Sequence, residues 1–239
     1  MLYSFKNLEL AKPITFYVGA HRAFSGYWGK KNIRIAIQTE QFCDATGQRL
    51  WWSDNTELIK NIKNALKNCD VFWDLSQHNM PFYQENNLDV LMKKKGIFGP
   101  YVFQKKQKEM RTFNKKHIIF YGTLNDRRRG LIKNFQGPKV KIAQRIYGAK
   151  LNRIIDRSAG VLNLHFAHGV YTEVPRVLSA YNRCRVLVSE TLASPFISSE
   201  HYISANNYEQ NKAEKTFKNF SSFVSDKYNF EVLLKEICM

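Results

Sequence analysis

The chain has 239 residues, of which 44% are hydrophobic, so it is long enough to bury the core of one large domain or two small ones. Lys and Arg number 37 against 20 Asp and Glu, for a formal net charge of +17, and the composition excludes a wholly disordered chain. No apolar run approaches the roughly 20 residues of a membrane-spanning helix. The first residues lack the layout of a signal peptide, so we expect a cytoplasmic protein.

The first half predicts a small α/β unit. Three apolar runs predict β-strands, at residues 14–20, 33–39 and 71–75. Residues 55–68 have apolar side chains at helical spacing and predict an amphipathic helix, and residues 96–102 predict one more strand. The polar stretch 104–116 is the best linker, so we place a domain boundary near residue 110.

Strand and helix patterns alternate in the second half. The predicted strands cover residues 117–123, 139–146, 160–166 and 185–189. The predicted helices cover residues 126–135, 149–157 and 173–182. Asn125 or Asp126 is expected to cap the first helix and Thr172 the last. Strands joined by helices in this way indicate a parallel sheet in a Rossmann-type layer.

The pattern weakens after residue 190. We expect a loop over residues 192–207 and two terminal helices, at 208–223 and 230–237, that could pack back across the domain boundary. The four cysteines, Cys43, Cys69, Cys184 and Cys238, form no C-x-x-C pair, so neither a disulfide framework nor a zinc site is indicated.

The positive charge is concentrated in one segment. Residues 105–153 contain 15 Lys and Arg and two acids, a net charge of +13. Such a field attracts polyanions, including nucleic acids, anionic lipid surfaces and phosphorylated substrates. A solvated basic face without a ligand is the alternative explanation.

Ligands of an open parallel sheet bind beyond the carboxyl ends of its strands. The candidate residues there are Gly122, Thr123, Asn125, Arg127, Arg128, Tyr147, Gly148, His165, Ser189 and Glu190. Gly122 permits close approach to the backbone, and a helix start with two following arginines suits a diphosphate. A first turn that merely faces water explains the same residues. Neither a Walker loop nor a G-x-G-x-x-G motif is present.

Glu173 and Arg176 form a second candidate group. A glutamate in the first turn of a helix, with an arginine three residues later, is explained by helix capping alone. However, His165 and the predicted loop through His168 would bracket one small volume with Glu173, so we predict that Glu173 and His165 contact a ligand. Glu190 follows a buried strand and is expected to accept hydrogen bonds from the hydroxyls of a ribose.

These residues lie in segments that resemble a known family. IIFYGTLNDRR at 118–128, VLNLHFAHGVYTEVPR at 161–176 and VLVSE at 186–190 are similar to the nucleotide-sugar-binding half of GT-B-fold glycosyltransferases, especially the bacterial and viral CgeB-like group. More loosely, IQTEQ at 37–41 and DVFWDLSQHN at 70–79 resemble elements of that group's first half. The resemblance covers about residues 30–190.

The resemblance implies an α/β fold of two Rossmann-like domains with parallel sheets and C-terminal helices. Residues 1–110 would form the acceptor side, and residues 111–239 the nucleotide-sugar side. The implied activity is transfer of a hexosyl or pentosyl group from a nucleoside diphosphate donor, without a metal or other cofactor. The absence of an Asp-x-Asp motif agrees with this. The first domain is short for the fold, which is compatible with a homodimer or a partner protein.

Site residues carry over by position. Arg127 and Arg128 would face the diphosphate, and Tyr147 with Gly148 would lie near the base. Glu173 and Arg176 would meet the sugar or a phosphate. Glu190 would hold the ribose, although the two glutamates are farther apart than in the common E-x7-E form.

An inverting transferase needs a general base from the first domain. The candidates are Glu40, Asp44 and His21, each of which is equally explained as an ordinary loop residue. The acceptor is expected to be a cell-envelope glycan or lipid-linked sugar, with the basic segment docked on the inner membrane surface. The first alternative is a phage-type enzyme that glycosylates a modified base in duplex DNA. The second is a non-catalytic nucleic-acid-binding module.

Overall fold

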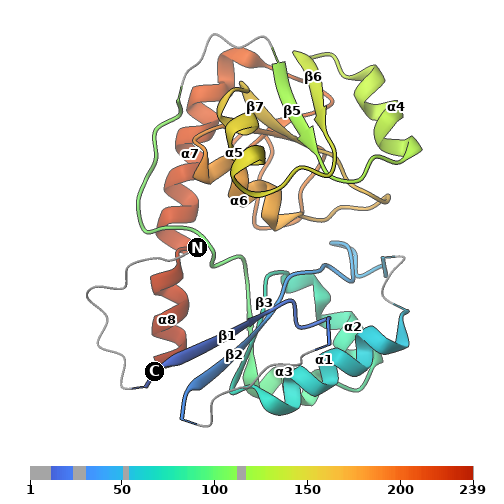
Figure 1. The fold of residues 1–239 in the computed structure, drawn as a ribbon, viewed down its shortest axis with the longest axis vertical. Coiled ribbons are helices and arrows are strands. Elements are labelled where there is room, and N and C mark those ends of the chain that lie inside the picture. The colour runs from blue at the N-terminus through green and yellow to red at the C-terminus, as the bar shows by residue number, and fades with distance from the viewer. Residues whose placement is uncertain (1–11, 24–30, 51–53, 112–116, 239) are drawn as a thin grey trace.

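The computed structural model describes residues 12–23, 31–50, 54–111 and 117–238, and within them it forms two parallel β-sheets with helices packed around each (Figure 1). The sheet built from the first half of the chain lies below, and the sheet built from the second half lies above it in this view. This confirms the expected α/β class with parallel sheets. Among the described residues, no helix has both the length and the hydropathy needed to cross a membrane.

The lower sheet has the strand order β1-β2-β3-β4. Its strands are β1 (Ile14–Val18), β2 (Ile33–Gln38), β3 (Val71–Asp74) and β4 (Gly96–Phe98). Between β2 and β3 runs α1 (Thr56–Asn68), which begins where the Asn55 side chain accepts the backbone N–H groups of Glu57 and Leu58. The sequence analysis missed the short elements that follow β3, namely η1 (Gln77–Asn79), α2 (Met80–Glu85) and α3 (Asp89–Lys95).

The upper sheet has the strand order β6-β5-β7-β8-β9. Its strands are β5 (His117–Tyr121), β6 (Lys139–Ala143), β7 (Gly160–Asn163), β8 (Val186–Ser189) and β9 (Ile203–Ser204). The crossover helices are α4 (Asp126–Asn134), α5 (Gly148–Asp156) and α6 (Val174–Asn182). The chain leaves β5 toward β6 and then returns to β7 on its other side, which opens a crevice at the carboxyl ends of these strands.

Two predictions for the upper layer were wrong. The predicted loop at 192–207 contains β9, whose Ile203 pairs with Val188 of β8. Thr172 does not cap α6, because its hydroxyl donates to the carbonyl of Ala193. The N-cap position belongs to Glu173, which makes no side-chain capping bond because its carboxylate points to other partners.

The C-terminal helices join the two layers. After η2 (Gln210–Lys212), α7 (Ala213–Lys227) packs on the upper sheet, whereas α8 (Phe230–Cys238) lies beside the lower one (Figure 1). Leu233 of α8 is fully buried against Ile35, Ile37 and Trp73 of the lower sheet. The last helix of the chain therefore completes the core of the first sheet. The domain boundary near residue 110 stays a prediction.

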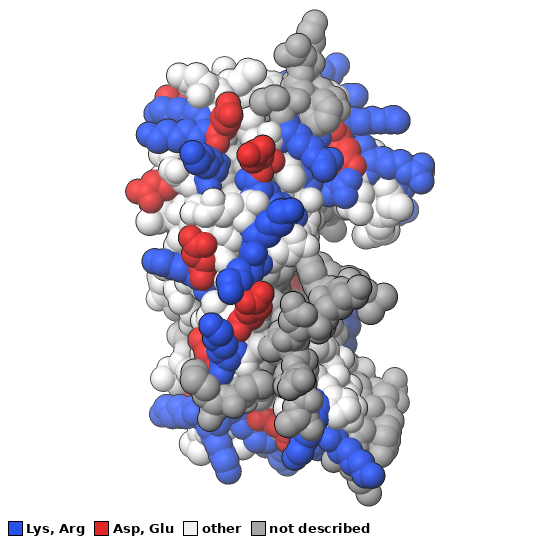
Figure 2. All heavy atoms as spheres, turned by 90° about the vertical axis from the view of Figure 1, so that its left-hand side faces the viewer, with Lys and Arg blue, Asp and Glu red and all other residues white. Residues whose placement is uncertain are grey.

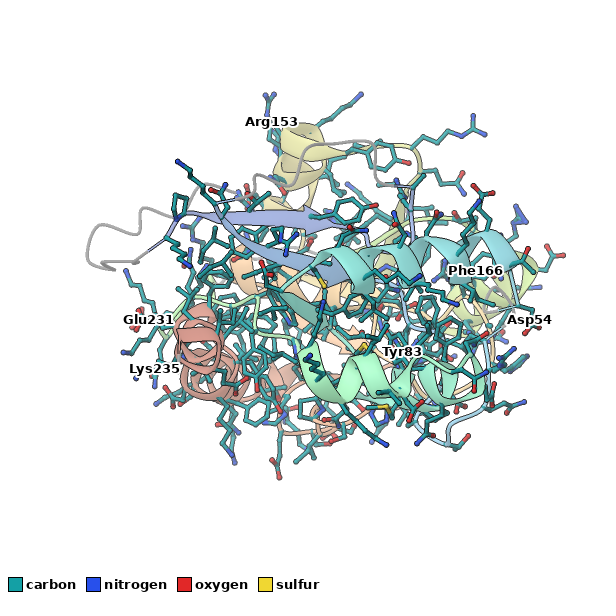
Figure 3. All side chains as sticks on the ribbon, turned by 90° about the horizontal axis from the view of Figure 1, so that it is seen from below. Asp54, Tyr83, Arg153, Phe166, Glu231 and Lys235 are labelled. Atoms are coloured by element: carbon teal, nitrogen blue, oxygen red, sulfur yellow. The ribbon has the colours of Figure 1, made fainter. Side chains whose placement is uncertain are left out.

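Replacing Leu233 with Ala should destabilise the protein by about 2–5 kcal/mol, because it leaves a cavity between α8 and the lower sheet. Urea unfolding gives the free energy. Lys235→Ala is the control on the same helix, since Lys235 lies on its outer, exposed side (Figure 3), and it should change stability by less than about 0.5 kcal/mol. Equal effects of the two substitutions would contradict the packing role of α8.

Candidate active site

An open cleft of about 660 Å³ lies where the two layers meet. Residues that follow β1 and β2 line it from the lower layer, and residues that follow β5 and β7 line it from the upper layer. The predicted site residues that line it are His21, Glu40, Gly122, Thr123, Arg128, Glu173 and Arg176. The structure therefore brings candidates from both halves of the chain to one volume.

The carboxylate of Glu173 binds three basic side chains. Arg176 Nη1 lies 2.9 Å from its Oε1, Arg128 Nη2 lies 3.2 Å from the same atom, and His165 Nδ1 lies 3.0 Å from Oε2. Burial by itself raises the pKa of Glu173, but the charges of Arg176, His165 and Arg128 together with the His165 hydrogen bond outweigh it and hold this pKa at about 2. Glu173 is thus ionised and fully engaged by the protein.

His165 is held as an imidazolium by its two acceptors. Its Nε2 lies 2.9 Å from the carbonyl oxygen of Thr191, and its Nδ1 faces the ionised carboxylate of Glu173. Because neither partner can donate, both ring nitrogens carry protons. Burial lowers the pKa of His165, yet its hydrogen bond and ion pair with Glu173 prevail, and the pKa is raised above 6.5.

Arg128 is a buried structural cation. Its side chain donates to the carbonyl oxygens of Leu164 at 2.7 Å and Thr123 at 2.6 Å. Burial is the main cause that lowers its pKa, to about 10, so it remains charged at neutral pH. Arg128, which the resemblance assigns to the diphosphate, lines the cleft, but most of its donors are already used by backbone carbonyls.

Arg176 is the cation that remains available. Its Nη1 donates to Asn163 Oδ1 at 2.9 Å and its Nε to the carbonyl of Tyr121 at 3.2 Å, whereas Nη2 donates to no described residue. Gly122 lies against it with φ +119°, and a Cβ there would come within 2.8 Å of Arg176 Nη2. The glycine thus makes room for the arginine as well as adopting a backbone conformation that other residues avoid.

The four charged groups around Glu173 carry a net positive charge on the upper wall of the cleft, whereas Glu40 lies on the opposite wall. Arg128, Arg176 and the His165 imidazolium give three positive charges against one for Glu173, a net charge of +2. In a partly dehydrated site such an excess attracts an anion more strongly than it would in water. The arrangement is suited to a ligand with two negative charges.

Arg127 and Glu190 lie together beside this group. They form a bidentate ion pair, with Arg127 Nη1 2.9 Å from Glu190 Oε2, and the same oxygen accepts the backbone N–H of His165 at 2.7 Å. Neither residue lines the cleft. The sequence analysis assigned Arg127 to a diphosphate and Glu190 to a ribose. In the structure the two side chains pair with each other.

The remaining candidates of the upper layer do not line the cleft, and these include His165, which is buried behind Glu173 rather than exposed to a ligand. Asn125 caps α4 by accepting the backbone N–H of Arg128 at 3.0 Å. Ser189 is buried and accepts from Asn163 Nδ2 at 2.9 Å. Tyr147 is 79% exposed, and it and Gly148 lie outside the residues that line the cleft.

The three candidates for a general base separate into two groups. His21 Nε2 lies 3.9 Å from Glu40 Oε1 in the cleft, and His21 Nδ1 is 3.2 Å from Gln38 Oε1. Burial lowers the pKa of His21 despite the opposing charge of Glu40, so the ring is neutral at neutral pH. Asp44 lies outside the cleft, because its Oδ1 accepts from Thr46 and Gln48 and closes a turn.

A buried amide network sets the position of Glu40. Asn79 donates to the carbonyl of Glu40 at 3.0 Å and to the carboxylate of Asp74, and it accepts the N–H of Phe42 at 2.7 Å. Burial raises the pKa of Asp74 to about 7. The sequence pointed to Asn79 only as part of the segment 70–79 that carries a family resemblance. Nothing in the local pattern of this segment shows that the Asn79 side chain supports a turn 39 residues earlier.

Gln41 connects the two layers and was also missed. Its side-chain carbonyl accepts the backbone N–H of Thr172, directly before Glu173, at 2.8 Å. Its amide nitrogen is buried without a hydrogen-bond partner among the described residues. No described group of three or more His, Cys, Asp and Glu side chains is placed to hold a metal ion.

Comparisons with known proteins add evidence on the fold. No protein-family model and no curated protein matches the sequence. The crystal structure of HepE from Anabaena, in complex with UDP, superposes with a TM-score of 0.55 over 87% of this chain and 71% of that chain, at 10% identity. The GtfA/B complex bound to UDP and GlcNAc gives a TM-score of 0.32 over 87% of this chain and 51% of that one, at 11% identity. The chain thus shares the α/β fold of HepE.

Replacing Glu173 with Gln should destabilise the protein by about 3–5 kcal/mol, because three buried cations lose their counter-charge. Since the folded-state pKa of Glu173 is lowered from 4.5 to about 2, its contribution is complete above pH 4.5 and is lost as the pH falls toward 2. The difference in unfolding free energy between wild type and variant should therefore shrink between pH 5 and pH 3 in urea titrations. A difference that stays constant would contradict this pairing.

The same substitution should lower the pKa of His165. In the wild type this pKa is raised, and without the Glu173 carboxylate the effect of burial, which lowers it, is opposed only by the smaller effects of the Thr191 hydrogen bond and the Glu190 charge. NMR titration of the histidine ring signals measures the change. His201 is the internal control, because burial lowers its pKa and Glu173 takes no part in that shift.

Proposed function

We propose that the protein is a glycosyltransferase that binds a nucleoside diphosphate sugar in the cleft between the two layers. The observation that carries the proposal is the net charge of +2 around Glu173, together with the Nη2 group of Arg176, which has no acceptor among the described residues. A diphosphate has the matching charge and geometry for an arginine fork. The fold shared with HepE, which was crystallised with UDP, supports a uridine diphosphate donor carrying a hexosyl or pentosyl group.

In this reaction an acceptor hydroxyl attacks the anomeric carbon, and the bond from that carbon to the diphosphate oxygen breaks. Glu40 or the neutral ring of His21 takes the hydroxyl proton, because both lie in the cleft on the opposite layer from Arg176. Arg176 and Arg128 balance the charge of the leaving diphosphate without a metal. Glu173 holds these cations in place and takes no proton.

The proposed acceptor is a cell-envelope glycan or a lipid-linked sugar. A second candidate function is transfer to a modified base in duplex DNA. The observation that favours it is the stretch of residues 127–155, which contains nine Lys and Arg and no acid. The two candidate functions differ in what this basic stretch would contact, which is either a membrane surface or duplex DNA. Binding measurements with each polyanion distinguish them.

UDP should bind with micromolar or better affinity and stabilise the protein by about 2.7 kcal/mol at 100 times its dissociation constant. Arg176→Gln should weaken UDP binding about 10- to 100-fold and leave uridine binding unchanged, because only the diphosphate meets this side chain. Isothermal titration calorimetry measures both ligands. Arg183→Gln is the matched control, since Arg183 pairs with Asp156 outside the cleft. No binding of any nucleoside diphosphate would refute the proposed function.

Glu40→Gln should leave UDP affinity within about two-fold and lower the rate of donor turnover about 100-fold or more, since it removes a proton acceptor and keeps the shape of the side chain. Release of UDP from its sugar donor, with envelope glycan as acceptor, measures the rate. Asp44→Asn should affect stability instead, because Asp44 closes a turn outside the cleft. A normal rate in both Glu40→Gln and His21→Gln would exclude these residues as the base.

A further inference from the structure

The outer edge of the upper sheet carries basic side chains that the proposed donor site does not use. They come from β6, the turn after it and α5, and they are Lys139, Lys141, Arg145, Lys150, Arg153 and Arg157. All six are exposed, and none has an ion pair with a described residue. We call this set the β6–α5 basic surface.

The charges of this surface are not balanced locally. The only acid within residues 139–157 is Asp156, which is paired with Arg183. By contrast, α7 and α8 expose four lysines and four acids, and their face of the molecule shows both signs interspersed (Figure 2). The β6–α5 basic surface thus carries six positive charges of the formal net charge of +17 with no acid left free among residues 139–157 to balance them.

Strand alternation places the strand lysines on the side of α5. Ala143 packs in the same core cluster as Ile155 of α5, so Lys141 and Lys139, two and four residues before it, lie on that side of β6. Arg153 extends from α5 away from the body of the protein (Figure 3). Lysines on an edge strand also prevent strand pairing, but this role cannot account for the cations on α5.

Large apolar side chains are exposed at the same edge. Ile142 is 46% exposed and, by the same alternation, lies on the face of edge strand β6 opposite to the strand lysines, and Tyr147 in the turn is 79% exposed. An exposed isoleucine adds nothing to the binding of nucleic-acid phosphates. A bilayer interface, in contrast, buries isoleucine and tyrosine side chains beside cations that contact lipid headgroups. The combination favours a membrane over a nucleic acid.

We propose that the β6–α5 basic surface docks the protein on an anionic lipid membrane. The surface runs along β6 to its carboxyl end, where Ala143 pairs with Tyr121, a residue that lines the cleft. Docking would thus hold the cleft close to acceptors that are anchored in lipid. This last step rests on the proposed function, while the docking itself does not.

The test is sedimentation of the full chain with vesicles of phosphatidylcholine alone or mixed with phosphatidylglycerol at about 2:1. We expect binding to the anionic vesicles only, and release when the salt rises from about 0.1 M to about 1 M. The double substitution Lys139→Gln with Lys141→Gln should lower the vesicle partition coefficient about 30-fold, because each cation contributes a factor of about five. Lys215→Gln with Lys218→Gln on α7 removes the same charge and should change it less than about two-fold.

Ile142→Ser separates the two polyanions. It should weaken vesicle binding and leave any binding to duplex DNA unchanged, and thermal unfolding verifies that the variant is folded. The proposal is overturned if anionic vesicles do not retain the wild type, if both lysine pairs have equal effects, or if DNA binds more tightly than vesicles at equal salt. UDP titration of the same samples reports on the donor site separately, so failure of docking and failure of the proposed function are distinguishable.

Discussion

The cleft depends on one carboxylate. Among the described residues, Glu173 is the acid that pairs with Arg128, Arg176 and His165 together, and these come from α4, α6 and the loop after β7. Three cations of this kind cannot share a buried volume without an anion between them, because each loses its hydration there. Their bonds to backbone carbonyls then fix the carboxyl ends of β5 and β7. An excess of two positive charges remains for a ligand.

The opposite wall of the cleft is held by uncharged groups. Asn79 binds the carbonyl of Glu40 and the carboxylate of Asp74, and Gln41 reaches across to the backbone of Thr172. Amides suit this position because they donate and accept at once without adding charge next to the cations. The result is a cleft with a cationic wall on one layer and a wall that carries Glu40 and His21 on the other.

Charge thus has two distinct uses in this chain. Around Glu173 the few cations are buried and paired, and they act through directed hydrogen bonds to the carboxylate and to backbone carbonyls. On the β6–α5 basic surface they are exposed and unpaired, and their value lies in a field that reaches about a Debye length into solvent. The same continuous stretch of sequence supplies both, since Arg128 and Lys139 belong to one acid-free run.

The sequence by itself determined all the described strands except β9, most helices and the convergence of Gly122, Arg128, Glu173 and Arg176, because periodicity and strand ends are local properties. It did not determine that Glu190 pairs with Arg127, that Asp44 closes a turn, or that α8 returns to the first sheet. Only the tertiary structure decided these, since a side chain chooses among partners that are distant in sequence according to distance and burial, and no local pattern encodes either.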